Sequence, residues 1–134
     1  MKRYFSVAAG LASAIAICAA GAVSAPHADA AGRVHFATPQ AAMRYLADAY
    51  NRGDAVAMHH VTTPTSFKQL WGMRSEAVHL KLQACHATGH GDYDCTFQHR
   101  YPKSFHDNGY GVSDVIVAPA DNPGWYMYTL VECG

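Results

Sequence analysis

The sequence has almost no net charge, and this lack limits the partners it can have. Its 134 residues carry ten Lys and Arg against ten Asp and Glu. Nucleic-acid binding needs a clustered basic surface, and attachment to anionic lipid headgroups needs a run of basic residues. The sequence contains neither feature. We therefore expect no nucleic-acid partner, and no membrane partner once the apolar leader described below has been removed.

Recognisable catalytic motifs are also missing. There is no HExxH sequence and no glycine loop that would cradle a phosphate. Residues 111–115 begin like a nucleophile elbow, but the final glycine is absent and the segment is predicted to be a strand. We therefore assign no catalytic residue and expect no cofactor.

The first thirty residues predict a secretory signal peptide. Lys2 and Arg3 precede an alanine-rich apolar stretch over residues 7–25, and Ala28-Asp29-Ala30 fits the small-x-small pattern of a signal peptidase site. Cleavage after Ala30 is expected, with cleavage after Ala25 as the alternative. An uncleaved anchor is disfavoured because alanine is weakly hydrophobic. The prediction is a secreted, extracellular protein in which residues 31–134 form one domain, since the 104 residues that follow Ala30 suffice for one domain only.

Three cysteines remain after the leader, in a compartment that oxidises thiols. Cys85 and Cys95 flank a turn-forming stretch over residues 88–92. A hairpin centred near His90 would place the two cysteines directly opposite each other, so we predict a Cys85–Cys95 disulfide with Cys133 left over. A Cys95–Cys133 bridge is the alternative.

Helical signals occupy the first half of the mature chain. Thr38 and Pro39 are a typical helix start, and apolar residues recur at helical spacing until Gly53. Asp54 is expected to cap a second helix over residues 55–60. Residues 62–64 are expected to break the chain, and a third short helix is predicted over residues 67–73, beginning at Thr65 or Ser66.

Strand signals occupy the second half. Residues 78–83 and 93–101 alternate between apolar and polar side chains, and two further strands are predicted over residues 111–118 and 125–132. Helices followed by antiparallel strands indicate an α+β fold, in which the N-terminal helices pack on one face of a curved four-stranded antiparallel sheet.

Residues 42–55, which read AMRYLADAYNRGDA, resemble the opening of domains in the NTF2-like superfamily, the cone-shaped fold shared with SnoaL-like proteins and ketosteroid isomerases. The resemblance implies a pocket between the first helix and the concave face of the sheet, and it transfers no catalytic residue. The side chains expected to line or fill that pocket are Tyr45, Tyr50, Trp71, Phe97, His99, Trp125 and Tyr128.

Two groups of polar residues could carry chemistry. His86, His90, Asp92 and Asp94 surround the predicted hairpin tip with imidazole and carboxylate groups, which suit a divalent ion. A polar turn whose carboxylates accept from backbone amides explains the same residues, so no metal site is assigned. Candidates for a general acid or base inside an apolar pocket are Asp48, His60, His99 and Asp114.

These observations leave three functional hypotheses. The first is a non-catalytic domain that binds a small ligand or another protein. The second is a pocket enzyme of the isomerase or hydratase type that uses an Asp or His together with a Tyr. The third is a structural secreted homodimer, packed sheet against sheet.

Overall fold

The structure is a computed structural model of the chain, and it describes residues 27–28, 34–102, 109–120 and 126–132. The predicted leader lies outside these residues except for His27 and Ala28, and Trp125 and Cys133 lie outside them altogether. Within the described ranges, no helix is both long enough and apolar enough to cross a bilayer.

Helix α1 (Pro39–Arg52) begins and ends where the sequence predicts. The Thr38 hydroxyl accepts a hydrogen bond from the Ala41 N–H at 3.2 Å, which satisfies one of the N–H groups that a first helical turn leaves open. Gly53 ends the helix with a φ of 71°, a left-handed conformation that glycine adopts without steric cost.

Two shorter helices follow. Asp54 caps α2 (Ala55–His59) by accepting from the Ala57 N–H at 3.0 Å, as expected. Helix α3 (Pro64–Met73) begins earlier than predicted, because Thr63 is its N-cap and Pro64 its first residue. The prediction of a chain break here is wrong, since proline at the first helical position loses no intrahelical hydrogen bond.

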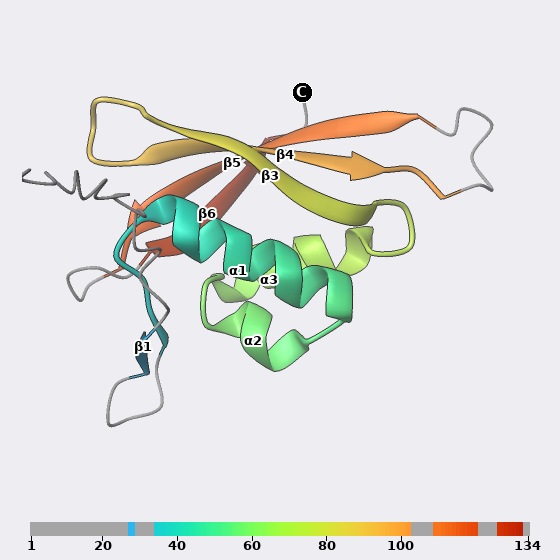
Figure 1. Cartoon of the computed structure of the whole chain (residues 1–134), viewed down its shortest axis with the longest axis horizontal. Helices are drawn as coiled ribbons and strands as arrows, with labels where there is room; N and C mark the ends of the chain where they lie inside the picture. Colours follow the sequence, from blue (N-terminus) through green and yellow to red (C-terminus); the bar gives the residue numbers. More distant parts are fainter. Residues whose placement is uncertain (1–26, 29–33, 103–108, 121–125, 133–134) are drawn as a thin grey trace, which may run out of the picture.

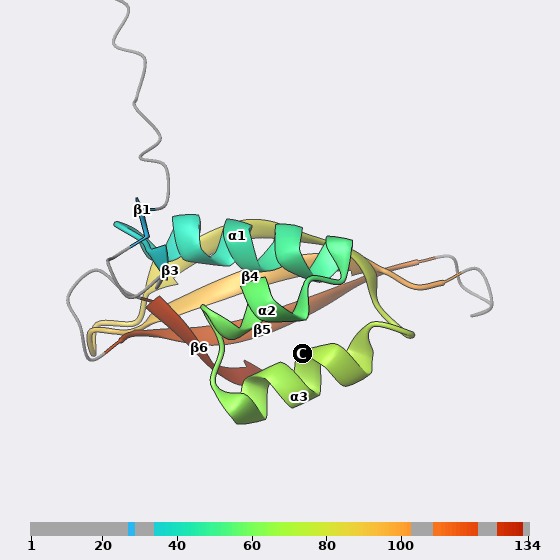
Figure 2. The same cartoon turned by 90° about the horizontal axis from the view of Figure 1, so that it is seen from below.

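The four predicted strands form one antiparallel sheet in sequence order, and it does not close into a barrel. It consists of β3 (Val78–Ala87), β4 (Tyr93–Arg100), β5 (Tyr110–Pro119) and β6 (Tyr126–Glu132). Figures 1 and 2 show all three helices on one face of this sheet. A separate two-stranded pair, β1 (His27–Ala28) and β2 (Val34–His35), precedes the helices. The predicted α+β architecture is confirmed.

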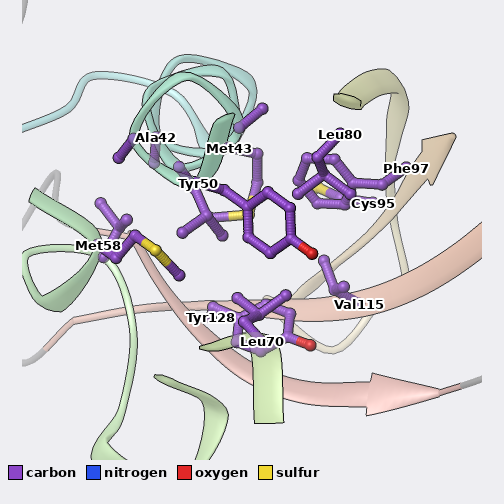
Figure 3. Packing of buried hydrophobic residues seen from close by; sticks show 14 of the residues in the cluster. Ala42, Met43, Tyr50, Met58, Leu70, Leu80, Cys95, Phe97, Val115 and Tyr128 are labelled. Carbon is purple, nitrogen blue, oxygen red and sulfur yellow. The ribbon is translucent and has the colours of Figure 1, made fainter. Parts of the chain in front are cut away.

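The core lies between the helices and the inner face of the sheet. Side chains from all three helices meet side chains from β4, β5 and β6 there (Figure 3). Its largest fully buried members include Tyr128, Phe97, Met43, Leu46 and Met58. Burying such large apolar surfaces is the main force that holds helices and sheet together.

Both outer strands are contacted by other parts of the fold at one point. On β3, the Asn51 side chain donates to the Leu80 carbonyl and accepts from the Leu80 N–H, both at 2.8 Å. On β6, the Tyr128 N–H donates to the Val61 carbonyl at 2.6 Å, and the Thr63 N–H donates to the Tyr128 carbonyl at 3.3 Å. These contacts satisfy backbone groups that an edge strand would otherwise leave open.

Candidate functional site

Three of the residues expected around a pocket are packed into the core. Tyr50, Phe97 and Tyr128 are each at most 2% exposed, and they fill the space between α1 and the sheet (Figure 3). The Tyr50 hydroxyl donates to the Ala77 carbonyl at 2.6 Å, and burial raises the pKa of Tyr50 to about 12. The described part of this layer is therefore a packed core held together by aromatic side chains.

The other expected pocket residues lie in separate places. Tyr45 is half-buried beside α2, Trp71 is exposed on α3, and His99 is buried near the end of β4. Trp125 lies outside the described residues. The structure thus does not bring these side chains together around one cavity.

His99 sits in a small polar group on the inner face of the sheet. Its Nδ1 atom lies 3.5 Å from the Ser113 hydroxyl, and its ring packs edge-on against Tyr101 with centroids 5.2 Å apart. Gly111 makes room for the ring, because a Cβ at that position would lie 2.6 Å from the His99 Cε1. Burial lowers the pKa of His99, so the neutral imidazole is favoured here.

The remaining acid or base candidates do not converge with His99. His60 lies 3.2 Å from the Tyr45 hydroxyl, on the helical side of the molecule, and burial, followed by the charge of Asp54, raises the pKa of Tyr45. Asp48 is exposed on α1. On β5, Asp114 stands between the buried residues Ser113 and Val115, so its side chain lies on the outer face of the sheet.

The hairpin between β3 and β4 contains the predicted disulfide. Cys85 and Cys95 are directly paired in the strand register, and their sulfurs are bonded. This confirms the predicted bridge and excludes the Cys95–Cys133 alternative. At the tip, the Thr88 N–H and hydroxyl both donate to the Asp92 carbonyl, at 3.0 and 3.2 Å. Among the residues that the structure describes, no group of three or more His, Cys, Asp or Glu could hold a metal ion.

Two shallow cavities lie where α1 meets β3. One, of about 270 Å³, is lined by Arg44, Ala47, Asp48, Leu80, Lys81 and Leu82. The other, of about 210 Å³, is lined by Tyr50, Asn51, Arg74, Ala77, Val78 and His79. The polar groups of Asn51 and Tyr50 at the second cavity already bond to Leu80 and Ala77, so they offer little to a ligand.

The most distinctive surface feature is a row of stacked side chains along α2 and α3, which we call the aromatic row: His59, Phe67, Trp71 and Arg74. His59 and Phe67 stack with ring centroids 3.8 Å apart, and Phe67 and Trp71 follow at 5.5 Å. The Arg74 guanidinium lies 4.7 Å above the Trp71 ring, a cation–π contact, and its Nε donates to the Tyr50 carbonyl at 3.2 Å.

Large apolar groups of this face remain in contact with solvent. Trp71 is 38% exposed although it is fixed between Phe67 and Arg74, and Val56 on α2 is 72% exposed. Val56 lies three residues before His59, so both occupy the same side of α2. The aromatic row and Val56 therefore form one partly apolar surface on the side of the helices.

Most of this surface is not predicted by the sequence. The spacing of Phe67, Trp71 and Arg74 by four and three residues does place them on one side of a helix, and this signal could have been used. The stacking of His59 on Phe67 is a contact between two helices, however, and the helical period within one segment does not reveal it.

Comparisons with known proteins give a fold and no family. No family model matches the chain, and no curated protein matches it. Among solved structures, it is similar to the solution structure of a SEC-C motif containing protein from Rhodopseudomonas palustris, with a TM-score of 0.55 and 17% sequence identity. The match covers 73% of this chain and 80% of that one. At this identity the likeness shows the fold alone.

The expected membership of the NTF2-like superfamily is therefore wrong, because the similar structure is that of a SEC-C motif protein and no family model links the chain to NTF2-like domains. Residues 42–55 form most of α1, the Gly53 turn and the capped start of α2. Any helix pair joined by a left-handed glycine and an aspartate cap can use such a segment, so the pattern specifies a local junction and not a family.

Proposed function

We propose that this protein is a non-catalytic binding domain whose contact surface is the aromatic row together with Val56. The observation that carries the proposal is the exposed Trp71 side chain, held between the Phe67 ring and the Arg74 guanidinium. Because its neighbours already fix it, Trp71 loses little conformational entropy when a partner covers it. Trp and Arg are also among the residues enriched at the energetic centres of protein interfaces.

Two further observations support binding over catalysis. The acid and base candidates His60, His99 and Asp114 lie on different parts of the fold. In the part of the chain that the structure describes, core side chains such as Tyr50 and Phe97 occupy the space between α1 and the sheet, which favours a ligand site on the outer surface.

The proposal can be tested by protein-observed NMR with a library of small aromatic fragments. We expect the perturbed amides to cluster on α2 and α3, and Trp71→Ala to abolish the perturbations while the fold is retained. Val112→Ala is the matched control, because Val112 is 53% exposed on a different element, β5. Perturbations that cluster on β5 or around His99, and persist in Trp71→Ala, would refute the proposal.

Homodimerisation through the outer face of the sheet is a second candidate function. Tyr110 and Val112 on β5 are 62% and 53% exposed, and Ile116 on the same side is half-buried. Paired sheets bury such residues against each other. Sedimentation equilibrium of the wild type and of Val112→Asp tests this. We expect the wild type to have the mass of a dimer and the variant to have the mass of a monomer. A monomer at all concentrations would contradict it.

We also propose that the protein is exported and loses its leader after Ala30. The predicted signal sequence supports export, and a disulfide is typical of proteins that function outside a reducing cytosol. The intact mass of the protein from the extracellular fraction should correspond to a chain that starts at Ala31. Recovery of the full-length chain inside the cell would contradict the proposal.

A further inference from the structure

We infer that the partner of the aromatic row is an acidic segment of another protein, one that carries carboxylates next to an aromatic or aliphatic side chain. The inference rests on the proposed function and adds the chemistry of the partner.

Helices α2 and α3 carry no acidic side chain, and the acidic residues Asp54 and Glu76 stand just outside them in the sequence. From residue 55 to residue 75 the chain contains Lys68, Arg74 and two histidines and no Asp or Glu. Lys68 is exposed and lies three residues before Trp71, so the two side chains are neighbours on α3. The whole chain is neutral, so Lys68 on α3 and Arg74 directly after it give this stretch a local excess of positive charge.

The nearest carboxylates do not neutralise these cations. Asp54 caps α2 through the Ala57 N–H, and its other oxygen lies 4.0 Å from Arg52. Within the described part of the chain, no carboxylate forms an ion pair with Lys68 or Arg74, and this includes Glu76, which follows Arg74 by two residues. The Nε of Arg74 bonds to the Tyr50 carbonyl and its terminal amino groups lie close to Gly53, so the exposed Lys68 is the cation best placed to meet a carboxylate from outside.

The apolar and charged groups lie close enough to be covered by one segment. The Arg74 guanidinium is 4.7 Å from the Trp71 ring, and Phe67 and His59 continue the row across to α2. A partner side chain packed against the exposed part of Trp71 would therefore hold a neighbouring carboxylate beside Lys68, with the Arg74 charge close by. Complementary charge at the border of such a contact speeds association and selects the partner.

Selection from a random peptide library displayed on phage tests this inference without knowledge of the natural partner. The folded wild-type domain is the target, and the selected peptides are then measured against Trp71→Ala and Lys68→Gln. We expect enriched peptides to combine Glu or Asp with aromatic or aliphatic residues. Trp71→Ala should weaken them by about 30-fold, the loss typical of an interface hot spot.

The matched charge control is Lys81→Gln, which removes an exposed lysine from β3 instead of α3. Lys68→Gln should weaken binding by about 2- to 5-fold, as expected for one exposed charge, and Lys81→Gln should have no effect. Added salt should also weaken wild-type binding.

The two possible failures are distinguishable. If the selected peptides depend on Trp71 but are neutral or basic, the aromatic row is a binding surface and the inference of an acidic partner is wrong. If no selected peptide responds to Trp71→Ala, the proposed function itself is wrong. Circular dichroism of each variant ensures that a loss of binding is not a loss of folding.

Discussion

Replacing Asn51 with alanine should destabilise the domain far more than its exposed position on α1 would indicate. The Asn51 amide makes two hydrogen bonds of 2.8 Å with the backbone of Leu80, one as donor and one as acceptor. Each such bond contributes about 1 kcal/mol to stability, so Asn51→Ala should lower the free energy of unfolding by about 2 kcal/mol. For a domain of this size, that corresponds to a fall in melting temperature of roughly 10 °C.

The assay is urea unfolding followed by circular dichroism, with Gln83→Ala as the control. Gln83 on β3 also forms a side-chain hydrogen bond, to Gln98 at 3.3 Å. This bond joins two exposed side chains and involves no backbone group. Its removal should change stability by less than about 0.5 kcal/mol. Asn51→Asp should resemble Asn51→Ala, since a carboxylate cannot donate to the Leu80 carbonyl. If Asn51→Ala and Gln83→Ala lower the free energy of unfolding equally, the hydrogen bonds of Asn51 to the Leu80 backbone do not contribute as claimed.

Three further predictions concern the sheet. Gly111→Ala should cost about 1–3 kcal/mol, because its Cβ would overlap the His99 ring; an unchanged urea midpoint would contradict this. Removing the disulfide by changing both Cys85 and Cys95 to serine should cost about 2–3 kcal/mol in the chain-entropy model, measured against the oxidised wild type, and equal stabilities would refute it. Burial lowers the pKa of His99 from 6.5, so the unfolded chain binds the proton more readily and stability should fall as pH drops below about 6.5. An NMR titration should give His99 a pKa below 6.5, and His99→Gln should reduce the loss of stability in acid.

Local signals in the sequence were sufficient for the fold class. Caps and stops such as Thr38, Gly53 and Asp54 act within a few residues of where they stand, and the structure uses each of them as predicted. The disulfide followed from the same kind of reasoning, because a hairpin fixes which residues face each other. The start of α3 was missed because Pro64 has two meanings: it can interrupt a chain or open a helix, and the Thr63 cap decides between them.

Most of the candidate site could not be predicted from the sequence. Aromatic side chains such as Tyr50 and Trp71 have similar apolar character, yet one is buried in the core and the other stands on the surface. The difference depends on which face of each helix meets the sheet, and that is decided by packing between distant segments. The same holds for His59, whose importance arises only when α2 and α3 come together.

The contacts at Leu80 and Tyr128 bear on how copies of this protein behave when they are crowded together. A foreign strand that approached β3 at Leu80 would first have to displace the Asn51 amide, and one that approached β6 at Tyr128 would have to displace residues 61–63. Pairing of strands between molecules, which leads to fibrils, is therefore hindered at both edges of the sheet. We expect concentrated solutions of the folded protein to stay free of thioflavin-positive material, and Asn51→Ala to lose that resistance first.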